Sequence, residues 1–262
     1  MAIKDWPGGV VSDEPVVPAG PYETSAASGI WTLDQVSDYV AQGIWPTAGV
    51  PNAPSLTSQQ TAFNGATTSI TITAPTSIVS GNLLVAFICH KDTDVGQKFA
   101  TVPSGWTAIS TASPANTASI MAYYKTATGS EPASYTWSGS TVSRDTTGII
   151  LNYSNASWDT AGSPYKYQSN PMTLTPNPTS LTVAADNSIV FFAAGSEDSG
   201  KTISAPSGYD TIVSQIGGSG QSGALWIFNK SLVSAGSSGT PSTTLSSTAQ
   251  GYVLMAVINP GS

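Results

Sequence analysis

Four acidic residues follow apolar, strand-like runs, and their type and spacing suit either calcium binding or carboxylate catalysis. Asp92 and Asp94 follow one such run, and Glu197 and Asp198 follow a similar run later in the chain. Calcium takes several oxygen ligands from a loop, and glycosidases use a pair of carboxylates, for which Asp159 is a fifth candidate. These four residues are therefore the candidate metal ligands, with ordinary solvated turn residues as the alternative interpretation. The spacing of an EF-hand loop is absent, so we expect no cofactor unless these loops bind calcium.

Cys89 and His90 are the single cysteine and the single histidine of the chain. They occupy consecutive positions of an apolar run that reads as a strand, where neighbours point to opposite faces, so they cannot form a Cys–His dyad. A Ser-His-Asp triad would have to use His90, and no G-x-S-x-G elbow stands at a strand-to-helix turn. Zinc lacks the cysteine and histidine ligands that it needs. We therefore expect a buried, inert thiol and a protein that is not an enzyme.

Aromatic side chains offer a different chemistry, because amphipathic rings stack on the apolar faces of sugars. Trp137 and Trp158 flank the end of the first half of the β region. Trp158, which lies near Asp159 and Tyr165, is the better candidate for an exposed glycan contact, with Tyr165 beside it. Trp106 and Tyr209 each follow a Pro-Ser-Gly turn at matching positions. For these two residues we favour packing in a core over contact with a ligand.

Composition excludes several classes of partner. The 262 residues carry a net charge of −7, and charged residues make up 9% of the chain, against roughly 25% in typical soluble domains. Phosphate groups are neutralised by clustered lysine and arginine, so we expect no nucleic-acid partner and no anionic membrane surface. No apolar stretch reaches the roughly 18 residues of a membrane span. The first residues lack the apolar core of a signal peptide, and one cysteine allows no internal disulfide.

Residues 1–56 read as an N-terminal arm with one short helix. Proline and glycine are frequent over 1–28, which predicts an extended segment. A helix is predicted over 30–44, where Thr32 and Gln35 form a capping box. One face of this helix is an apolar stripe at helical spacing, formed by Leu33, Val36 and Val40. So short a helix needs a surface to dock on, which is either the chain's own sandwich or a partner subunit.

The remainder of the chain is predicted to be all-β and internally duplicated. Three segments recur in the same order at similar spacing: 82–87 with 187–192, 102–106 with 205–209, and 120–125 with 225–230. Short apolar runs between turn residues predict an antiparallel β-sandwich of jelly-roll-like type. We place the first repeat at 57–160 and the second at 161–262. They form either two small sandwiches or one merged, pseudo-symmetric sandwich, and the short connection favours the merged form.

The N-terminal segment carries a resemblance to a known class of proteins. Residues 29–46 read Gly-Ile-Trp-Thr-Leu, then the short amphipathic helix, then Gly-Ile-Trp-Pro. This segment resembles one common in structural and fibre proteins of tailed bacteriophages. The repeats are similar to β-sandwich units of phage virion proteins and of bacterial surface proteins, through four segments: Gly81 to Val85, Pro103 to Trp106, Tyr123 to Lys125 and Gly129 to Trp137.

This resemblance implies a non-enzymatic structural protein exposed on the surface of the extracellular phage particle. A tail fibre or appendage that contacts the host stands slightly ahead of a capsid decoration protein. The implied partners are other capsid or tail proteins, further copies of the chain (often as a trimer), and a glycan of the host surface. The residues that would dock on the particle are Trp31, Leu33, Val36, Val40 and Trp45. The alternative is a carbohydrate-binding or adhesive module of a bacterial cell-surface protein.

Overall fold

The computed structural model divides the chain into two units, Met1–Pro51 and Asn52–Ser262. It describes these residues: 4–6, 9–11, 37, 41, 52–91, 99–110, 119–158, 165–168, 180–198, 200–216, 223–247 and 251–261.

The first unit contains a short antiparallel strand pair, β1 (Lys4–Trp6) with β2 (Gly9–Val11). Of the helix predicted over 30–44, the structure describes Ser37 and Ala41, which are both helical and exposed. The five predicted docking residues lie outside the described residues: Trp31, Leu33, Val36, Val40 and Trp45. Their role in docking therefore stays a prediction.

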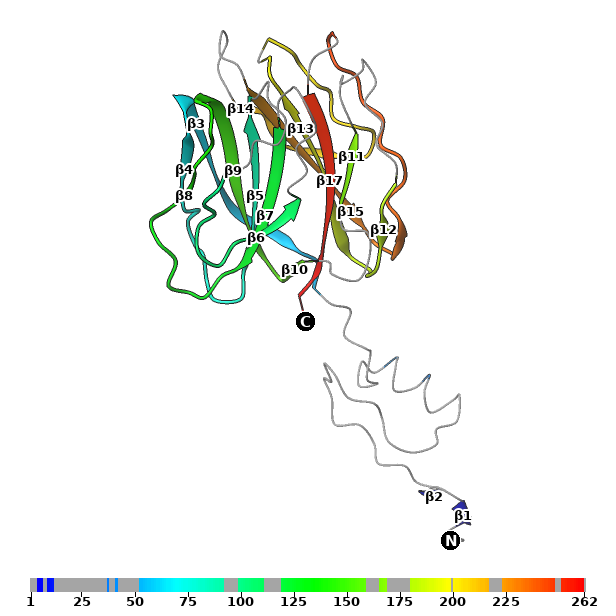
Figure 1. Ribbon diagram of the computed structural model, residues 1–262. Helices are drawn as coiled ribbons and strands as arrows, with labels where there is room; N and C mark the ends of the chain where they lie inside the picture. The colour runs from blue at the N-terminus through cyan, green and yellow to red at the C-terminus, as the bar shows by residue number, and fades with distance from the viewer. Residues whose placement is uncertain are drawn as a thin grey trace. The chain divides into compact units, whose positions relative to one another are not determined.

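The second unit is a β-sandwich, which confirms the predicted all-β class (Figure 1). The first large sheet holds, in spatial order, β3 (Ser55–Thr67), β9 (Arg144–Ser154), β5 (Leu83–His90), β7 (Ser119–Thr126) and β6 (Thr107–Ser110). The second holds β17 (Gly251–Pro260), β13 (Ser188–Ser196), β15 (Ala224–Leu232) and β14 (Asp210–Ile216), with β10 (Ala156–Trp158) and β11 (Tyr165–Gln168) both pairing with β17. Every pairing among the described strands is antiparallel.

Each half also has a small two-stranded sheet. In the first half β4 (Ser69–Thr73) pairs with β8 (Ser134–Ser138). In the second half β12 (Thr182–Val183) pairs with β16 (Gly236–Ser237). The order β9-β5-β7-β6 of the first large sheet is repeated as β17-β13-β15-β14 in the second, so the segments that match in sequence take equivalent places.

The two large sheets pack face to face in reversed order. β7 lies against β17, and β9 lies against β15, with β5 and β13 in the centre. The two sheets approach each other closely in the centre: a Cβ atom at Gly195 would lie 2.9 Å from the Cys89 Sγ atom of the other sheet. Of the two arrangements that the sequence left open, the structure has the merged one.

Burial on both faces explains the long apolar runs of the central strands, residues 83–89 of β5 and 189–194 of β13. All eight residues of β5 are buried. Val85 and Phe87 point into a core shared with the second large sheet, whereas Leu84 and Ala86 point into a core beneath the small sheet of β4 and β8. A strand buried on both faces needs a continuous apolar run, and β13 follows the same rule.

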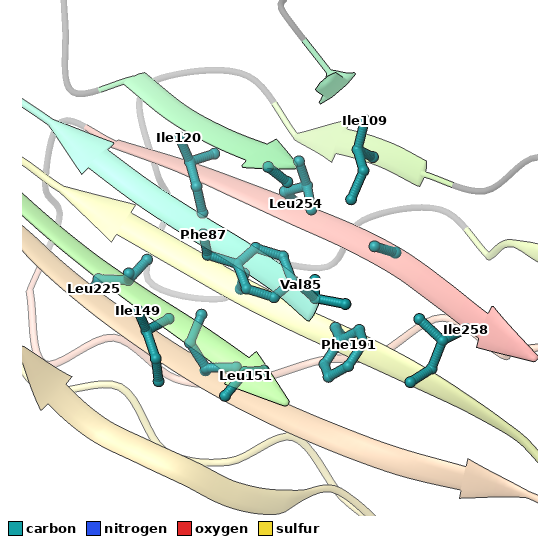
Figure 2. Close-up of a cluster of buried hydrophobic side chains, with 14 of the residues drawn as sticks. Val85, Phe87, Ile109, Ile120, Ile149, Leu151, Phe191, Leu225, Leu254 and Ile258 are labelled. Carbon is teal, nitrogen blue, oxygen red and sulfur yellow. The ribbon is translucent and has the colours of Figure 1, made fainter. Parts of the chain in front are cut away.

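Aromatic rings from both halves pack against one another in the shared core. Phe191 of β13 is fully buried and meets Phe87 of β5 edge-on, with ring centroids 5.5 Å apart. Its ring also meets Tyr153 of β9 at 5.7 Å, again edge-on. Edge-to-face pairs of this kind stabilise a core beyond the area they bury. Figure 2 shows Phe87 and Phe191 within this cluster, with Ile149, Leu225 and Leu254 around them.

Candidate functional site

The candidate calcium ligands are only in part within the described residues. Asp92 and Asp94 lie outside them, so their role stays a prediction. Asp198 is exposed, accepts a hydrogen bond from the Gly200 N–H at 2.8 Å and lies 3.2 Å from the Lys201 ammonium. The Gly200 hydrogen bond and the Lys201 charge hold the pKa of the Asp198 carboxyl below its usual value, although burial opposes them. These contacts are those of an ordinary turn carboxylate.

The structure does bring the starts of the two acidic loops to the same end of the sandwich. The Cys89 Sγ atom lies 3.9 Å from the Ser196 carbonyl oxygen. The two strands end at His90 and Ser196, so the loops begin side by side at Lys91 and Glu197. Among the described residues, no three histidine, cysteine, aspartate or glutamate side chains come together as a metal site.

Cys89 and His90 point to opposite faces of β5, as the sequence predicts. Cys89 is fully buried in the shared core, and burial raises the pKa of its thiol to about 12. His90 lies on the other face, with its Nδ1 atom 2.7 Å from the Thr146 hydroxyl and its Nε2 atom 3.1 Å from the Ser140 hydroxyl. Burial, aided by the charge of Arg144, lowers the pKa of His90 to about 4. The ring is therefore neutral at pH 7 and serves as a buried polar link between β5, β9 and the turn at Ser140.

Two residues of the segment Gly129 to Trp137, Glu131 and Trp137, stabilise the fold of the first half. The Glu131 carboxylate accepts hydrogen bonds from the Lys125 ammonium at 2.6 Å, the Tyr135 hydroxyl at 2.6 Å and the Thr128 N–H at 2.8 Å. Burial alone would raise the pKa of Glu131, but these hydrogen bonds and the Lys125 charge outweigh it and hold the pKa at about 2. The network ties β7 to β8. Trp137, at the end of the segment, is fully buried beside Trp106.

Trp106 and Tyr209 pack in cores at equivalent places, which confirms the interpretation favoured from the sequence. Each is 8% exposed. Trp106 belongs to the core beneath β4 and β8, and Tyr209 to the core of the second half that contains Val183 of β12. Neither ring presents a face to solvent that a sugar could stack on.

Trp158 occupies a different kind of place, at the rim of the interface between the large sheets. It is half-buried in β10 and stacks on Tyr124 of β7, with ring centroids 5.0 Å apart and 14° between the planes. Both rings pack against the shared core from its edge. The stack therefore bridges the first and second large sheets and keeps part of each ring at the surface.

Tyr165, the second predicted glycan contact, lies beside the same strand as Trp158. Trp158 pairs with Ile258 of β17, and Tyr165 pairs with Ala256, two residues along. The backbone thus places the two predicted residues on one edge of β17, while the Tyr165 side chain lies outside the described residues. Tyr124, which completes the stack, was missed by the sequence reasoning, because its partner lies in the other sheet.

A pocket of about 360 Å³ lies where β9 passes into β10, the strand that carries Trp158. Its lining residues come from the turn before β5, from the passage between β9 and β10, and from the end of β17: Val79, Ser80, Gly81, Asn82, Ser154, Asn155, Ala156 and Gly261. None of these side chains carries a charge. Ala156 is two residues from Trp158 on the same face of β10, which places them ~7 Å apart along the strand.

The backbone of the pocket is fixed by specific turns. Asn155 has a φ of +51°, and Gly81 has a φ of +89°, conformations in which asparagine and glycine are favoured. The Asn155 carbonyl accepts a hydrogen bond from the Gly261 N–H at 2.9 Å, which holds the chain end against the pocket. Asn82 is buried and donates from Nδ2 to the Asn152 side-chain oxygen at 2.8 Å. The uncharged pocket and the Trp158–Tyr124 stack together form the candidate functional site.

No helix among the described residues is long and apolar enough to cross a membrane. Comparison of the chain with protein-family models, with curated proteins and with solved structures finds no match.

Proposed function

We propose that this chain is a non-enzymatic structural protein exposed on the surface of a bacteriophage particle. A tail fibre or appendage is the leading location, ahead of capsid decoration. The observation that supports this proposal best is the division into two units. One is a short N-terminal unit with the Gly-x-Trp segments, and the other is a large sandwich whose two large sheets share a core. This division suits a protein whose N-terminal unit anchors it to other capsid or tail proteins and whose sandwich is exposed on the outside of the particle.

The chemistry of the sandwich supports an exposed structural role. One core is shared by both repeats and each repeat has a further core of its own, which would make the sandwich rigid. Charged residues are few. Serine, threonine, asparagine and glutamine supply much of the polarity that charged residues supply in most proteins. The proposal includes assembly with further copies of the chain, as a trimer or another closed oligomer.

A carbohydrate-binding or adhesive module of a bacterial surface protein is the second candidate. It is favoured by one observation, the uncharged pocket where β9 passes into β10, the strand that carries the half-buried Trp158. The two candidates differ in what the N-terminal unit does, because an adhesive module would bind its glycan without that unit.

Replacing both tryptophans of the N-terminal segment tests the proposal in the full chain. We expect particles made with the double variant Trp31→Ala, Trp45→Ala to lack the protein, because truncation removes the large apolar anchors from the predicted docking surface. Immunoblots of purified particles against the cell lysate measure this loss. The matched control is Val233→Ala, an exposed apolar residue of the sandwich, which should leave incorporation unchanged. Full incorporation of the double variant would contradict the docking role.

A further inference from the structure

We propose that the pocket of Val79, Asn82 and Asn155 binds a neutral glycan, with Trp158, two residues along β10 from the lining residue Ala156, as an additional aromatic contact. The inference does not depend on where the protein is located, on a particle or on a cell. It assigns a ligand class to a site that the fold builds from three segments far apart in the sequence: 79–82, 154–156 and Gly261.

The size and lining of the pocket suit a sugar residue. Its volume, about 360 Å³, falls within the ~300–1,000 Å³ range of small-molecule sites. Ser80 and Asn155 are exposed at its surface and offer a hydroxyl and an amide, each of which both donates and accepts hydrogen bonds. Sugar hydroxyls require this mixture of donors and acceptors, because each hydroxyl also plays both roles. The backbone beside them is held by hydrogen bonds from the Gly81 N–H to the Ala127 carbonyl and from the Gly261 N–H to the Asn155 carbonyl.

The aromatic rim supplies the apolar half of the recognition. Trp158 is held by its stack on Tyr124 and by packing on the shared core, so its position is set before any ligand arrives. Preorganised groups lose little conformational freedom on binding, which favours affinity. The Cα atoms of Ala156 and Trp158 are ~7 Å apart along β10, a separation that a second sugar of an oligosaccharide could span. The arrangement therefore favours an oligosaccharide over a single monosaccharide.

The same lining argues against other ligand classes. Phosphate is most often bound with the help of lysine or arginine, and calcium with the help of carboxylates, whereas no lining side chain is charged. A purely apolar ligand would leave the Ser80 and Asn155 groups without hydrogen bonds, which costs binding energy. A neutral polyhydroxylated ligand is the class that satisfies the site.

The test uses the labelled full chain on an array of neutral oligosaccharides of hexoses and N-acetylhexosamines, with sialylated and sulfated oligosaccharides beside them. Affinity for the best ligand is then measured by calorimetry. Val79→Trp places a large side chain at the pocket mouth, where Val79 is 59% exposed, and should weaken binding at least about tenfold. The matched control Val233→Trp puts the same side chain at a site that is 78% exposed and does not line the pocket. This control should bind like the unmodified chain.

A second variant probes a single polar group. Asn155→Gly removes the amide but keeps the positive φ, so it should fold normally and bind about threefold to tenfold more weakly. Loss of binding in both pocket variants and not in Val233→Trp supports the proposal. The proposal is overturned if the array shows no neutral ligand, if acidic glycans bind equally well, or if Val79→Trp binds as tightly as the control. None of these results bears on particle incorporation, which the tryptophan variants test separately.

Discussion

Phe191→Ala is expected to lower the free energy of unfolding by about 3–5 kcal/mol, the range for a fully buried phenylalanine. Phe191 belongs to the second repeat, but its ring packs on Phe87 and Tyr153 of the first repeat. The cavity left by the substitution therefore lies in the core that both large sheets share. We expect one cooperative unfolding transition, shifted as a whole, in urea denaturation followed by circular dichroism.

Phe192→Ala is the matched comparison, because Phe192 points to the opposite face and packs on Phe228 and Tyr209 within the second half. If the halves form one cooperative unit, both variants shift the same single transition. Hydrogen exchange followed by mass spectrometry then shows β5 and β13 losing protection together. A Phe191→Ala chain in which β5 keeps its protection while β13 loses it would show that the halves unfold independently.

Acid is expected to destabilise the sandwich through His90, and the effect has a definite pH window. Its pKa is about 4 in the folded protein, against 6.5 for a histidine exposed to water. Between these values the unfolded chain binds more protons than the folded one, so stability is full above pH 6.5 and is lost as the pH falls towards 4. The loss between pH 7 and pH 4 is about 3 kcal/mol. Urea denaturation at a series of pH values measures it.

The control for this prediction is His90→Gln, which cannot titrate in this range. Glu131 also loses its contribution in acid, but its pKa of about 2 places that loss below pH 4.5, the ordinary value for glutamate. The slope of stability against pH between 6.5 and 5 therefore isolates the histidine. We expect this slope to flatten in the variant, whatever its absolute stability. An unchanged slope would show that His90 does not control the acid response.

The strands were predictable because burial imposes a readable pattern on them. The runs at 83–89 and 189–194 are apolar at every position, since each strand packs on two layers, and the recurring spacing placed them in equivalent positions. The merged arrangement was one of two that the sequence left open, because the pattern of an apolar face does not show which sheet it packs against. Trp106 and Tyr209 were assigned to cores correctly, since two matching turns predict two matching environments.

The candidate site was predictable only in part. Trp158 was identified as an amphipathic ring near a segment boundary, but its stack on Tyr124 depends on contact between two sheets. No local sequence pattern indicates the pocket, because its lining consists mainly of small turn residues that strand pairing brings together. Ser140 and Thr146, which hold His90, were missed for the same reason.

The copy number of this protein in purified particles of the phage that encodes it tests the central claim most directly. Quantitative mass spectrometry would compare its peptides with those of the major capsid protein. We predict that the protein co-purifies at a fixed ratio, with far fewer copies than the major capsid protein on a tail fibre, or a comparable number in a capsid decoration protein. Its absence from clean particles would contradict the virion assignment and leave the carbohydrate-binding surface module as the better account.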